Sequence, residues 1–216
     1  AYTCKKKLGT EYAISTNSDI YLYELANGKT TNVSEGIMGY DKNPRFSPDG
    51  KYLVWTSMER DGFEVDKTRL MLLDLTDPSQ QKTDITSNID REAEDPQWSA
   101  DSKKIYFQLS DQGTLQIAYY DLTMKRIVKF TNGIQNYNAF FLGKDVIIAE
   151  KTTLTDPQEI VKIESDGTEK PFSSFNTKFW NTIKKPEVKK RMVKTKDGKD
   201  MLAWVVYPPD FNATKK

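Results

Sequence analysis

An acidic run at residues 90–95, D-R-E-A-E-D, holds the side chains best suited to binding chemistry in this chain. Glu92 and Glu94 lie two residues apart, next to a predicted inner strand. A carboxylate can bind an ammonium group, because a charge that leaves water needs an opposite charge and hydrogen bonds as partners. Glu92 and Glu94 are therefore candidate binding residues. The alternative is a loop that faces solvent, and the sequence leaves both interpretations open.

The absence of histidine limits the catalytic chemistry of the chain. Hydrolytic triads take their general base from imidazole, and most zinc sites use it as a ligand. The Gly-x-Ser-x-Gly elbow, the glycine motifs for phosphates and dinucleotides, a Cys-x-x-Cys pair and an EF-hand loop are absent too. We expect no catalytic residue, no metal site and no cofactor here, and no hydrolase activity from this chain alone.

A loop at residues 58–67 is a second segment that can meet a partner. In the functional interpretation it reaches toward a partner domain or a substrate, with Phe63 as the contact and Glu59 or Glu64 as polar anchors. In the simpler interpretation it is a long connection between strands, and Arg60 and Asp61 simply face water. The sequence leaves both open.

Two other features have simple explanations. The basic run at residues 184–191 can bind an anion, but a solvated linker explains it as well. The four tryptophans are interpreted as core or interface packing and not as platforms for carbohydrates or bases. They are Trp55, Trp98, Trp180 and Trp204.

The strands that must position the acidic run and the 58–67 loop are predicted from a sequence repeat with an offset of 52 residues. The stretch P-R-F-S-P-D-G-K-Y-L-V-W at residues 44–55 recurs as P-Q-W-S-A-D-S-K-K-I-Y-F at residues 96–107. Pro48 presets φ in the turn, Asp49 can bond its own backbone, and Gly50 tolerates a positive φ. Each copy therefore predicts a hairpin. A repeat of about 40 to 50 residues with four strands is typical of a β-propeller blade.

The rest of the chain fits the same pattern. Residues 69–75, R-L-M-L-L-D-L, are apolar on both faces, which predicts a strand sandwiched between neighbouring blades. We predict an all-β fold, a partial β-propeller of about 3.5 TolB/WD40-like four-stranded antiparallel blades over residues 1–180. After residue 175 the pattern changes, and a separate hairpin with its turn at residues 196–199 is predicted.

Composition excludes several classes of function. Thirty-two Lys and Arg against 31 Asp and Glu leave a net charge of +1, so we expect no nucleic-acid partner. The longest apolar runs are about seven residues, against ~20 for a membrane span, so we expect no membrane partner. The single cysteine cannot form an internal disulfide. The start, A-Y-T, has neither an initiator Met nor a signal peptide, and we expect an excised piece.

Three segments together resemble a known family. Residues 11–25, 57–67 and 193–211, the last reading V-K-T-K-D-G-K-D-M-L-A-W-V-V-Y-P-P-D-F, are similar to the bacterial dipeptidyl peptidase 5 and acylaminoacyl peptidase branch of the prolyl oligopeptidase family of serine peptidases. The resemblance implies that a propeller covers the active site of an α/β-hydrolase domain. Residues 181–216 would then be a linker and the first hairpin of a truncated hydrolase domain, with the catalytic triad beyond Lys216.

The expected function follows from this resemblance. The chain would be the noncatalytic propeller portion of a serine exopeptidase, gating oligopeptide access to the missing hydrolase domain. Related peptidases hold the substrate's amino terminus with propeller carboxylates, the role this implies for Glu92 and Glu94. The resemblance places the parent in the periplasm or outside the cell, although this piece carries no signal. The alternative is a TolB-like binding propeller that acts through protein partners. A half ring also leaves two uncovered faces, so we expect self-association.

Overall fold

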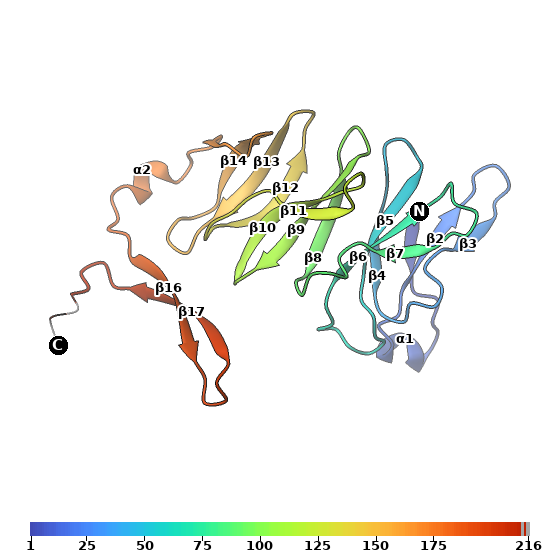
Figure 1. Cartoon of the computed structure of the whole chain (residues 1–216), viewed down its shortest axis with the longest axis horizontal. Helices are drawn as coiled ribbons and strands as arrows, with labels where there is room; N and C mark the ends of the chain where they lie inside the picture. Colours follow the sequence, from blue (N-terminus) through green and yellow to red (C-terminus); the bar gives the residue numbers. More distant parts are fainter. Residues whose placement is uncertain (213, 215–216) are drawn as a thin grey trace.

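The computed structural model describes residues 1–212 and 214, and within them nearly all regular structure is β-strand. Four consecutive antiparallel sheets, blades 1 to 4, follow one another along an arc, and a separate hairpin lies below them (Figure 1). The short helices are α1 (Thr10–Ile14), between the first two strands, and α2 (Thr177–Trp180), after blade 4. The predicted all-β propeller fold is confirmed.

The strands of each blade pair in chain order. Blade 1 has three strands, β1 (Tyr2–Cys4), β2 (Asp19–Tyr23) and β3 (Thr30–Asn32). Blade 2 has β4 (Asp41–Phe46), β5 (Tyr52–Ser57), β6 (Arg69–Asp74) and β7 (Lys82–Asp84). Blade 3 has β8 (Ala93–Trp98), β9 (Lys104–Asp111), β10 (Thr114–Asp121) and β11 (Arg126–Lys129). Blade 4 has β12 (Asn136–Leu142), β13 (Val146–Thr152), β14 (Glu159–Glu164) and β15 (Glu169–Pro171). The hairpin is β16 (Glu187–Lys194) with β17 (Asp200–Tyr207).

The repeated turn has the chemistry that the sequence predicts. Gly50 has φ 72° and its N–H donates to the Ser47 carbonyl at 2.9 Å. The Asp49 carboxylate accepts from the Ser47 hydroxyl at 2.6 Å and from the Lys51 N–H at 3.1 Å. In the second copy Ser102 replaces the glycine at φ 59°. Its hydroxyl accepts from the Asp49 N–H at 3.1 Å, so the two turns are joined across neighbouring blades.

Both faces of β6 are buried, as predicted. Leu70 belongs to the apolar cluster between blades 2 and 3, where it joins Ala93 and Ile105. Met71 and Leu73 belong to the cluster between blades 1 and 2. Because successive side chains of a strand point to opposite faces, one strand contributes to two cores. The blades are therefore held together face to face by apolar packing.

The first strands of blades 2 and 3 share an irregular backbone. A bulge interrupts β4 between Lys42 and Arg45 and β8 between Glu94 and Gln97. Asn43 and Asp95 have φ 55° and 46°, a region that Asn and Asp tolerate better than most side chains. Strand β4 contacts β8, and β8 contacts β12, so the first strands lie side by side. The two copies of the 52-residue repeat thus share the same bulge and the same positive φ in their first strands.

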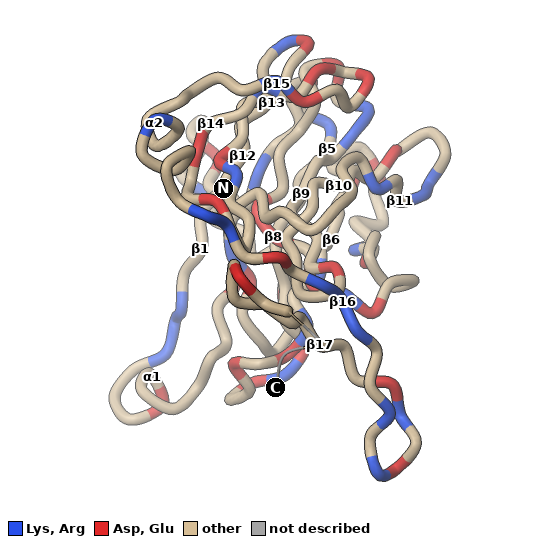
Figure 2. Tube along the Cα trace, turned by 90° about the vertical axis from the view of Figure 1, so that its left-hand side faces the viewer, with Lys and Arg blue, Asp and Glu red and all other residues tan. Residues whose placement is uncertain are grey.

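The basic run differs from the prediction of a linker. Residues 187–191 form the first part of β16, where Lys189 pairs with Val205 and Arg191 with Ala203. Strand β16 therefore begins at Glu187, and its Lys and Arg positions are visible along the strand in Figure 2. The charged side chains of β16 stay exposed, but its backbone pairs with that of the apolar strand β17. Local composition favoured a linker, and pairing across the turn decided otherwise.

The uncovered end faces predict self-association of this chain. Blade 1 has three strands, and on blade 4 Phe141 and Phe172 are 70% and 68% exposed. Apolar faces and free strand edges promote pairing between chains. We expect sedimentation analysis to show a concentration-dependent rise in mass for the purified chain. A single monomeric species at high micromolar concentration, with full solubility, would contradict this.

Candidate functional site

A cavity of about 280 Å³ lies between blades 2 and 3, beside their first strands. Its lining combines two acids and one amide from blade 3 with a lysine, a tyrosine and a methionine from the blade 2 side. The lining residues are Tyr40, Lys42, Asn43, Thr56, Ser57, Met58, Thr68, Glu94, Asp95 and Gln108. Of the two predicted site residues, Glu94 lines this cavity and Glu92 does not.

The start of β8 positions the two glutamates. Ala93 is fully buried, and its N–H donates to the Thr68 carbonyl of blade 2 at 3.0 Å. Glu92 and Glu94 flank Ala93, so they share the side of the strand that faces away from the core. Both side chains are exposed, Glu94 at the mouth of the cavity. The bulge after Glu94 also brings Asp95 into the lining.

The electrostatics of the cavity centre on Glu94. Partial burial raises the pKa of its carboxyl group, and the negative charges of Glu92 and Asp95 raise it further, while a hydrogen bond with Thr68 opposes the shift. A cation that binds here relieves the repulsion among the three carboxylates. On the opposite wall the Lys42 ammonium lies 3.4 Å from the centre of the Tyr40 ring. The cavity therefore combines the carboxylates of Glu94 and Asp95 with the ammonium group of Lys42.

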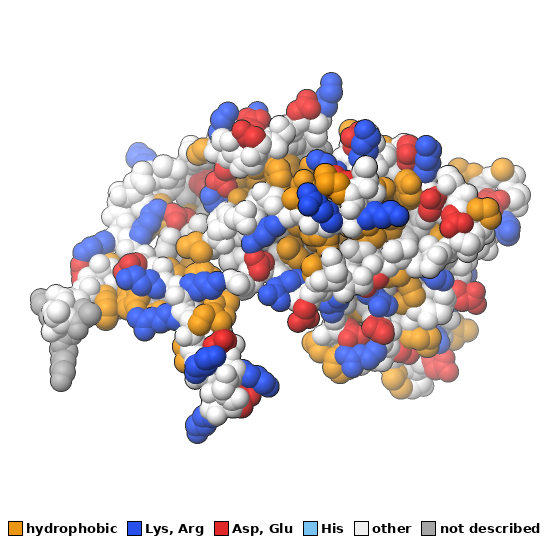
Figure 3. All heavy atoms as spheres, viewed as in Figure 1, with side chains coloured by type: hydrophobic (Ala, Val, Ile, Leu, Met, Phe, Trp, Pro, Cys, Tyr) orange, Lys and Arg blue, Asp and Glu red, His pale blue; other side chains and the backbone are white. Residues whose placement is uncertain are grey.

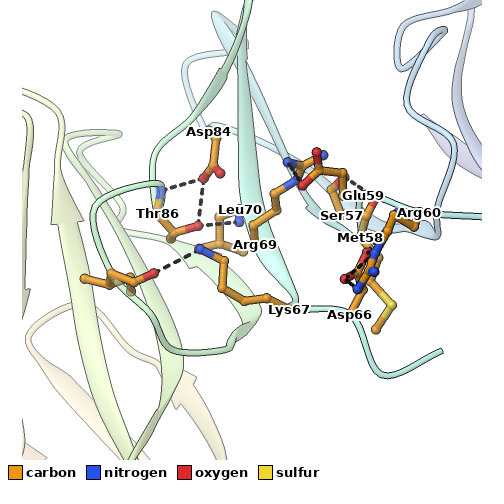
Figure 4. Close-up of polar contacts among 11 residues, drawn as sticks. Ser57, Met58, Glu59, Arg60, Asp66, Lys67, Arg69, Leu70, Asp84 and Thr86 are labelled. Atoms are coloured by element: carbon orange, nitrogen blue, oxygen red, sulfur yellow. Dashed lines mark hydrogen bonds and ion pairs between the residues drawn. The ribbon is translucent and has the colours of Figure 1, made fainter. Parts of the chain in front are cut away.

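The loop at residues 58–67 is anchored on its own protein (Figure 4). Glu59 pairs with Arg69 at 3.6 Å, and Glu64 accepts from the Tyr40 hydroxyl at 3.3 Å. Both predicted polar anchors thus have partners within the chain. Phe63 is 43% exposed, and Arg60 stacks on its ring at 4.0 Å. At the far end of the loop Lys67 donates to the Ile89 carbonyl at 2.9 Å, which ties the loop to the segment before β8.

Asp61 is exposed to solvent, as the simpler interpretation predicts, but its carboxylate is also bound within the chain. Its Oδ1 accepts from the Ser15 hydroxyl at 2.8 Å and from the N–H groups of Thr16 and Asn17 at 2.7 and 3.1 Å. These hydrogen bonds, the one from Ser15 first, lower the pKa of the Asp61 carboxyl group. The Gly62 N–H returns a bond to the Thr16 hydroxyl at 2.9 Å. Sequence reasoning missed this contact, because no local pattern links residues 46 positions apart.

The tryptophans pack within the chain, as predicted. Trp55 is fully buried between blades 1 and 2 and donates to Asp41 at 2.9 Å. Trp98 stacks on Tyr52 with ring centres 6.0 Å apart. Trp180 donates to the Thr155 carbonyl at 2.7 Å. Each indole thus fixes two segments of the protein against each other, and Trp204 does the same at the hairpin.

The hairpin contacts blade 3 through Trp204. Its indole N–H donates to the Gln112 carbonyl in the β9–β10 turn at 3.3 Å, and the Lys190 side chain contacts the Gln112 side chain. The next residue, Gly113, has φ +75°, and a Cβ there would lie 3.1 Å from the indole nitrogen. A larger residue would push Trp204 away. The hairpin therefore rests on the turn that joins the second and third strands of blade 3.

Across residues 1–212 and 214 there is no group of three or more His, Cys, Asp and Glu side chains placed to hold a metal ion. Neither of the described helices has the length and apolar character needed to cross a membrane.

Comparisons with known proteins identify the relatives of this chain. No family model matches it. It is 39% identical to dipeptidyl-peptidase 5 of Porphyromonas gingivalis and 42% identical to dipeptidyl-peptidase 5 of Porphyromonas endodontalis. Each alignment covers 100% of this chain and 31% of the relative. The chain therefore spans about a third of the length of these relatives.

Two solved structures resemble the fold. Pyrococcus horikoshii acylaminoacyl peptidase superposes with a TM-score of 0.69 and 20% identity over 88% of this chain and 28% of that one. The β-propeller domain of the Trilobed protease from Pyrococcus furiosus gives 0.56 and 21% over 74% of this chain and 44% of that domain. These similarities show the propeller fold. The 39–42% sequence identity, which extends over the whole of this chain, identifies it as a relative of dipeptidyl-peptidase 5.

Proposed function

We propose that this chain is the noncatalytic propeller portion of a serine exopeptidase and gates the access of oligopeptides to a hydrolase domain that begins at the β16–β17 hairpin. The observation that carries the proposal is the docking of this hairpin on blade 3. The curated relatives are named dipeptidyl-peptidases, which supports a substrate with a free amino terminus.

The composition of the hairpin supports a second domain. Strand β17 reads D-M-L-A-W-V-V-Y, with apolar residues on both of its faces. One face holds Leu202 and Trp204 and lies against blade 3, and the other holds Met201 and Val205. A two-stranded hairpin is marginally stable in water, and a strand that is apolar on both faces is typical of a larger buried sheet. We infer that further strands and helices of the whole protein cover this hairpin.

Glu94 is the residue we propose to bind the substrate. Its carboxylate, with Asp95 beside it in the cavity and Glu92 on the same side of the strand, offers an anionic partner to the α-ammonium group of a peptide. The apolar side chain of Met58 and the ring of Tyr40 give a first side chain something to pack against. In this proposal the cavity selects peptides by their free amino terminus, and the hydrolase domain supplies the chemistry.

Glu94→Gln tests the proposed role in the whole protein, meaning the product of the uninterrupted reading frame. Because a hydrogen bond with a charged group contributes about 1.5–3 kcal/mol, we expect KM for a peptide with a free amino terminus to rise about 10- to 100-fold. An N-acylated substrate should be affected much less. The matched control is Glu35→Gln. Glu35 is an exposed glutamate outside the cavity lining, so this substitution should change KM for neither the free nor the N-acylated substrate.

The outcomes separate the role of Glu94 from the function itself. Equal changes for free and acylated substrates would reject Glu94 as the ammonium partner. A reading frame that continues past Lys216 into another blade, or that lacks a Gly-x-Ser-x-Gly elbow followed by Asp and His, would reject the peptidase. The TolB-like binding propeller would then be the better description.

A further inference from the structure

We propose that the cavity between blades 2 and 3 binds a small zwitterion, a dipeptide with both ends free, and that the whole protein is thereby inhibited by its own product. The α-ammonium group of the dipeptide would meet Glu94 and Asp95, and its carboxylate would meet Lys42. The inference rests on the proposed function for the identity of the product, but the binding itself is a property of this chain.

The two charged walls of the cavity come from equivalent positions of the 52-residue repeat. Lys42 in β4 and Glu94 in β8 are 52 residues apart in the sequence. Each is followed directly by a residue of positive φ at a bulge, Asn43 in one copy and Asp95 in the other. All four residues line the cavity. The repeat therefore sets a cation and an anion in the same backbone setting on opposite walls.

The opposite charges of the cavity do not neutralise each other. The Lys42 ammonium lies 3.4 Å from the centre of the Tyr40 ring, and the Tyr40 hydroxyl donates to Glu64 at 3.3 Å. Within the part of the chain that the structure describes, Lys42 forms no ion pair with Glu94 or Asp95. An ammonium group has three donors, so one that rests on an aromatic ring can still donate to a carboxylate. The separated charges thus leave room for a ligand that carries both signs.

The size of the cavity limits the ligand to a few heavy atoms on each side of one peptide bond. Its volume is about 280 Å³. This lies between the ~150 Å³ of a cavity that holds benzene and the upper range of pockets for drug-sized ligands, about 1,000 Å³. Met58 and the Tyr40 ring offer apolar contact to a first side chain. A dipeptide fits these limits, whereas a longer peptide would place its carboxylate outside the cavity.

The rest of the surface gives no preference for one sign of charge. On the face of the molecule shown in Figure 3, basic and acidic side chains are interspersed. The chain as a whole carries a net charge of +1. A surface of mixed charge does not draw ligands of one sign toward a cavity over a long distance. Selection of a zwitterion therefore depends on the charged groups in the cavity walls.

Hydrolysis creates the group that Lys42 would bind. In an oligopeptide the carbonyl group of the second residue belongs to a neutral amide. When water cleaves that bond, the dipeptide gains a carboxylate and the remaining peptide gains an amine. Charge-assisted hydrogen bonds are stronger than those between neutral groups. The released dipeptide would therefore bind the cavity more tightly than the same two residues do within the substrate, and it would compete with the next substrate.

Isothermal titration calorimetry of this chain with three matched ligands tests the inference. The ligands are Leu-Ala, N-acetyl-Leu-Ala and Leu-Ala amide, which carry both charges, only the carboxylate and only the ammonium group. We expect Leu-Ala to bind about tenfold more tightly than either derivative, because each derivative loses one charged partner.

Variants assign each charge of the ligand to its wall. Lys42→Met should weaken binding of Leu-Ala about tenfold and leave binding of the amide unchanged. Glu94→Gln should weaken binding of Leu-Ala about tenfold and leave binding of the N-acetyl derivative unchanged. The matched controls are Lys29→Met and Glu35→Gln, because both residues are exposed and lie outside the cavity lining. Neither control should change any of the three affinities.

The outcomes separate this inference from the proposed function. Equal binding of the three ligands, or no binding of Leu-Ala at high millimolar concentration, would overturn the inference. So would a Lys42→Met variant that loses the amide as strongly as Leu-Ala, because the lysine would then not recognise the carboxylate. If Leu-Ala binds as expected but the whole protein releases no dipeptides, the zwitterion site stands and the proposed function fails. If the whole protein releases dipeptides and Leu-Ala inhibits it no better than the two derivatives do, the proposed function stands and this inference fails.

Discussion

Replacing Trp55 with alanine is expected to lower the free energy of unfolding of this chain by about 3–5 kcal/mol, the range for large aromatic side chains lost from a core. The Trp55 ring is fully buried and packs with Ile20, Leu53 and Met71 between blades 1 and 2. Its indole N–H also donates to Asp41, so the substitution leaves a cavity and a buried carboxylate with one partner fewer. Domains are typically stable by only about 5–15 kcal/mol, so much of the folded population would be lost.

Urea unfolding followed by circular dichroism measures this effect, and Trp98 provides the matched control. The Trp98 ring is only partly buried, stacks on Tyr52 and donates to the Arg45 carbonyl at 3.1 Å. Trp98→Ala should therefore cost less, about 1–2 kcal/mol. If Trp55→Ala and Trp98→Ala lower the free energy of unfolding by the same amount, the apolar cluster between blades 1 and 2 does not stabilise the chain more than the Trp98 contact does.

Replacing Asp41 with asparagine is expected to stabilise the chain at neutral pH and to remove a pH dependence. Asp41 is fully buried, and burial raises the pKa of its carboxyl group to about 6 despite the hydrogen bond from the Trp55 indole. The ordinary value is 3.8, and the difference corresponds to about 3 kcal/mol between the two protonation states. Asparagine keeps an oxygen for the Trp55 N–H and carries no charge.

The sign of the pH dependence follows from proton binding. The folded chain holds the Asp41 proton up to about pH 6, whereas the unfolded chain releases it near pH 3.8. The contribution of this group to stability is thus full below pH 3.8 and is lost as the pH rises through about 6. We expect Asp41→Asn to be more stable than the wild type at pH 7.5 by about 1–3 kcal/mol, and the difference to shrink toward pH 4.

Asp49→Asn is the matched control for this measurement. Asp49 is accessible in the repeated turn, and its hydrogen bonds with Ser47 and Lys51 lower its pKa. Its contribution has the opposite sign, because it is present above the unfolded pKa and lost on acidification. Unfolding curves from pH 4 to 8 should therefore separate the two variants. A loss of stability in Asp41→Asn at pH 7.5 would mean that the buried carboxylate is better stabilised by its neighbours than its burial suggests.

Local sequence was sufficient to predict the blades. The Pro48, Asp49 and Gly50 turn and the two-faced apolar pattern of β6 each depend on residues a few positions apart, and the recurrence after 52 residues repeats one such local pattern. Turn chemistry and strand period act over that same distance, so the strands and their order could be predicted. The acidic run could also be singled out as a candidate site, since carboxylate type and spacing are visible in the sequence.

Tertiary structure decided which of those residues lie together. Glu94 lines a cavity with Lys42 and Glu92 does not, although the two glutamates share one side of the strand, because the packing of blade 3 on blade 2 sets where the cavity lies. The Asp61 contact joins residues 46 positions apart. The strand formed by residues 187–191 depends on its apolar partner β17. Sequence determined which elements form, because their causes are local, while contacts between blades depend on packing geometry that no local pattern records.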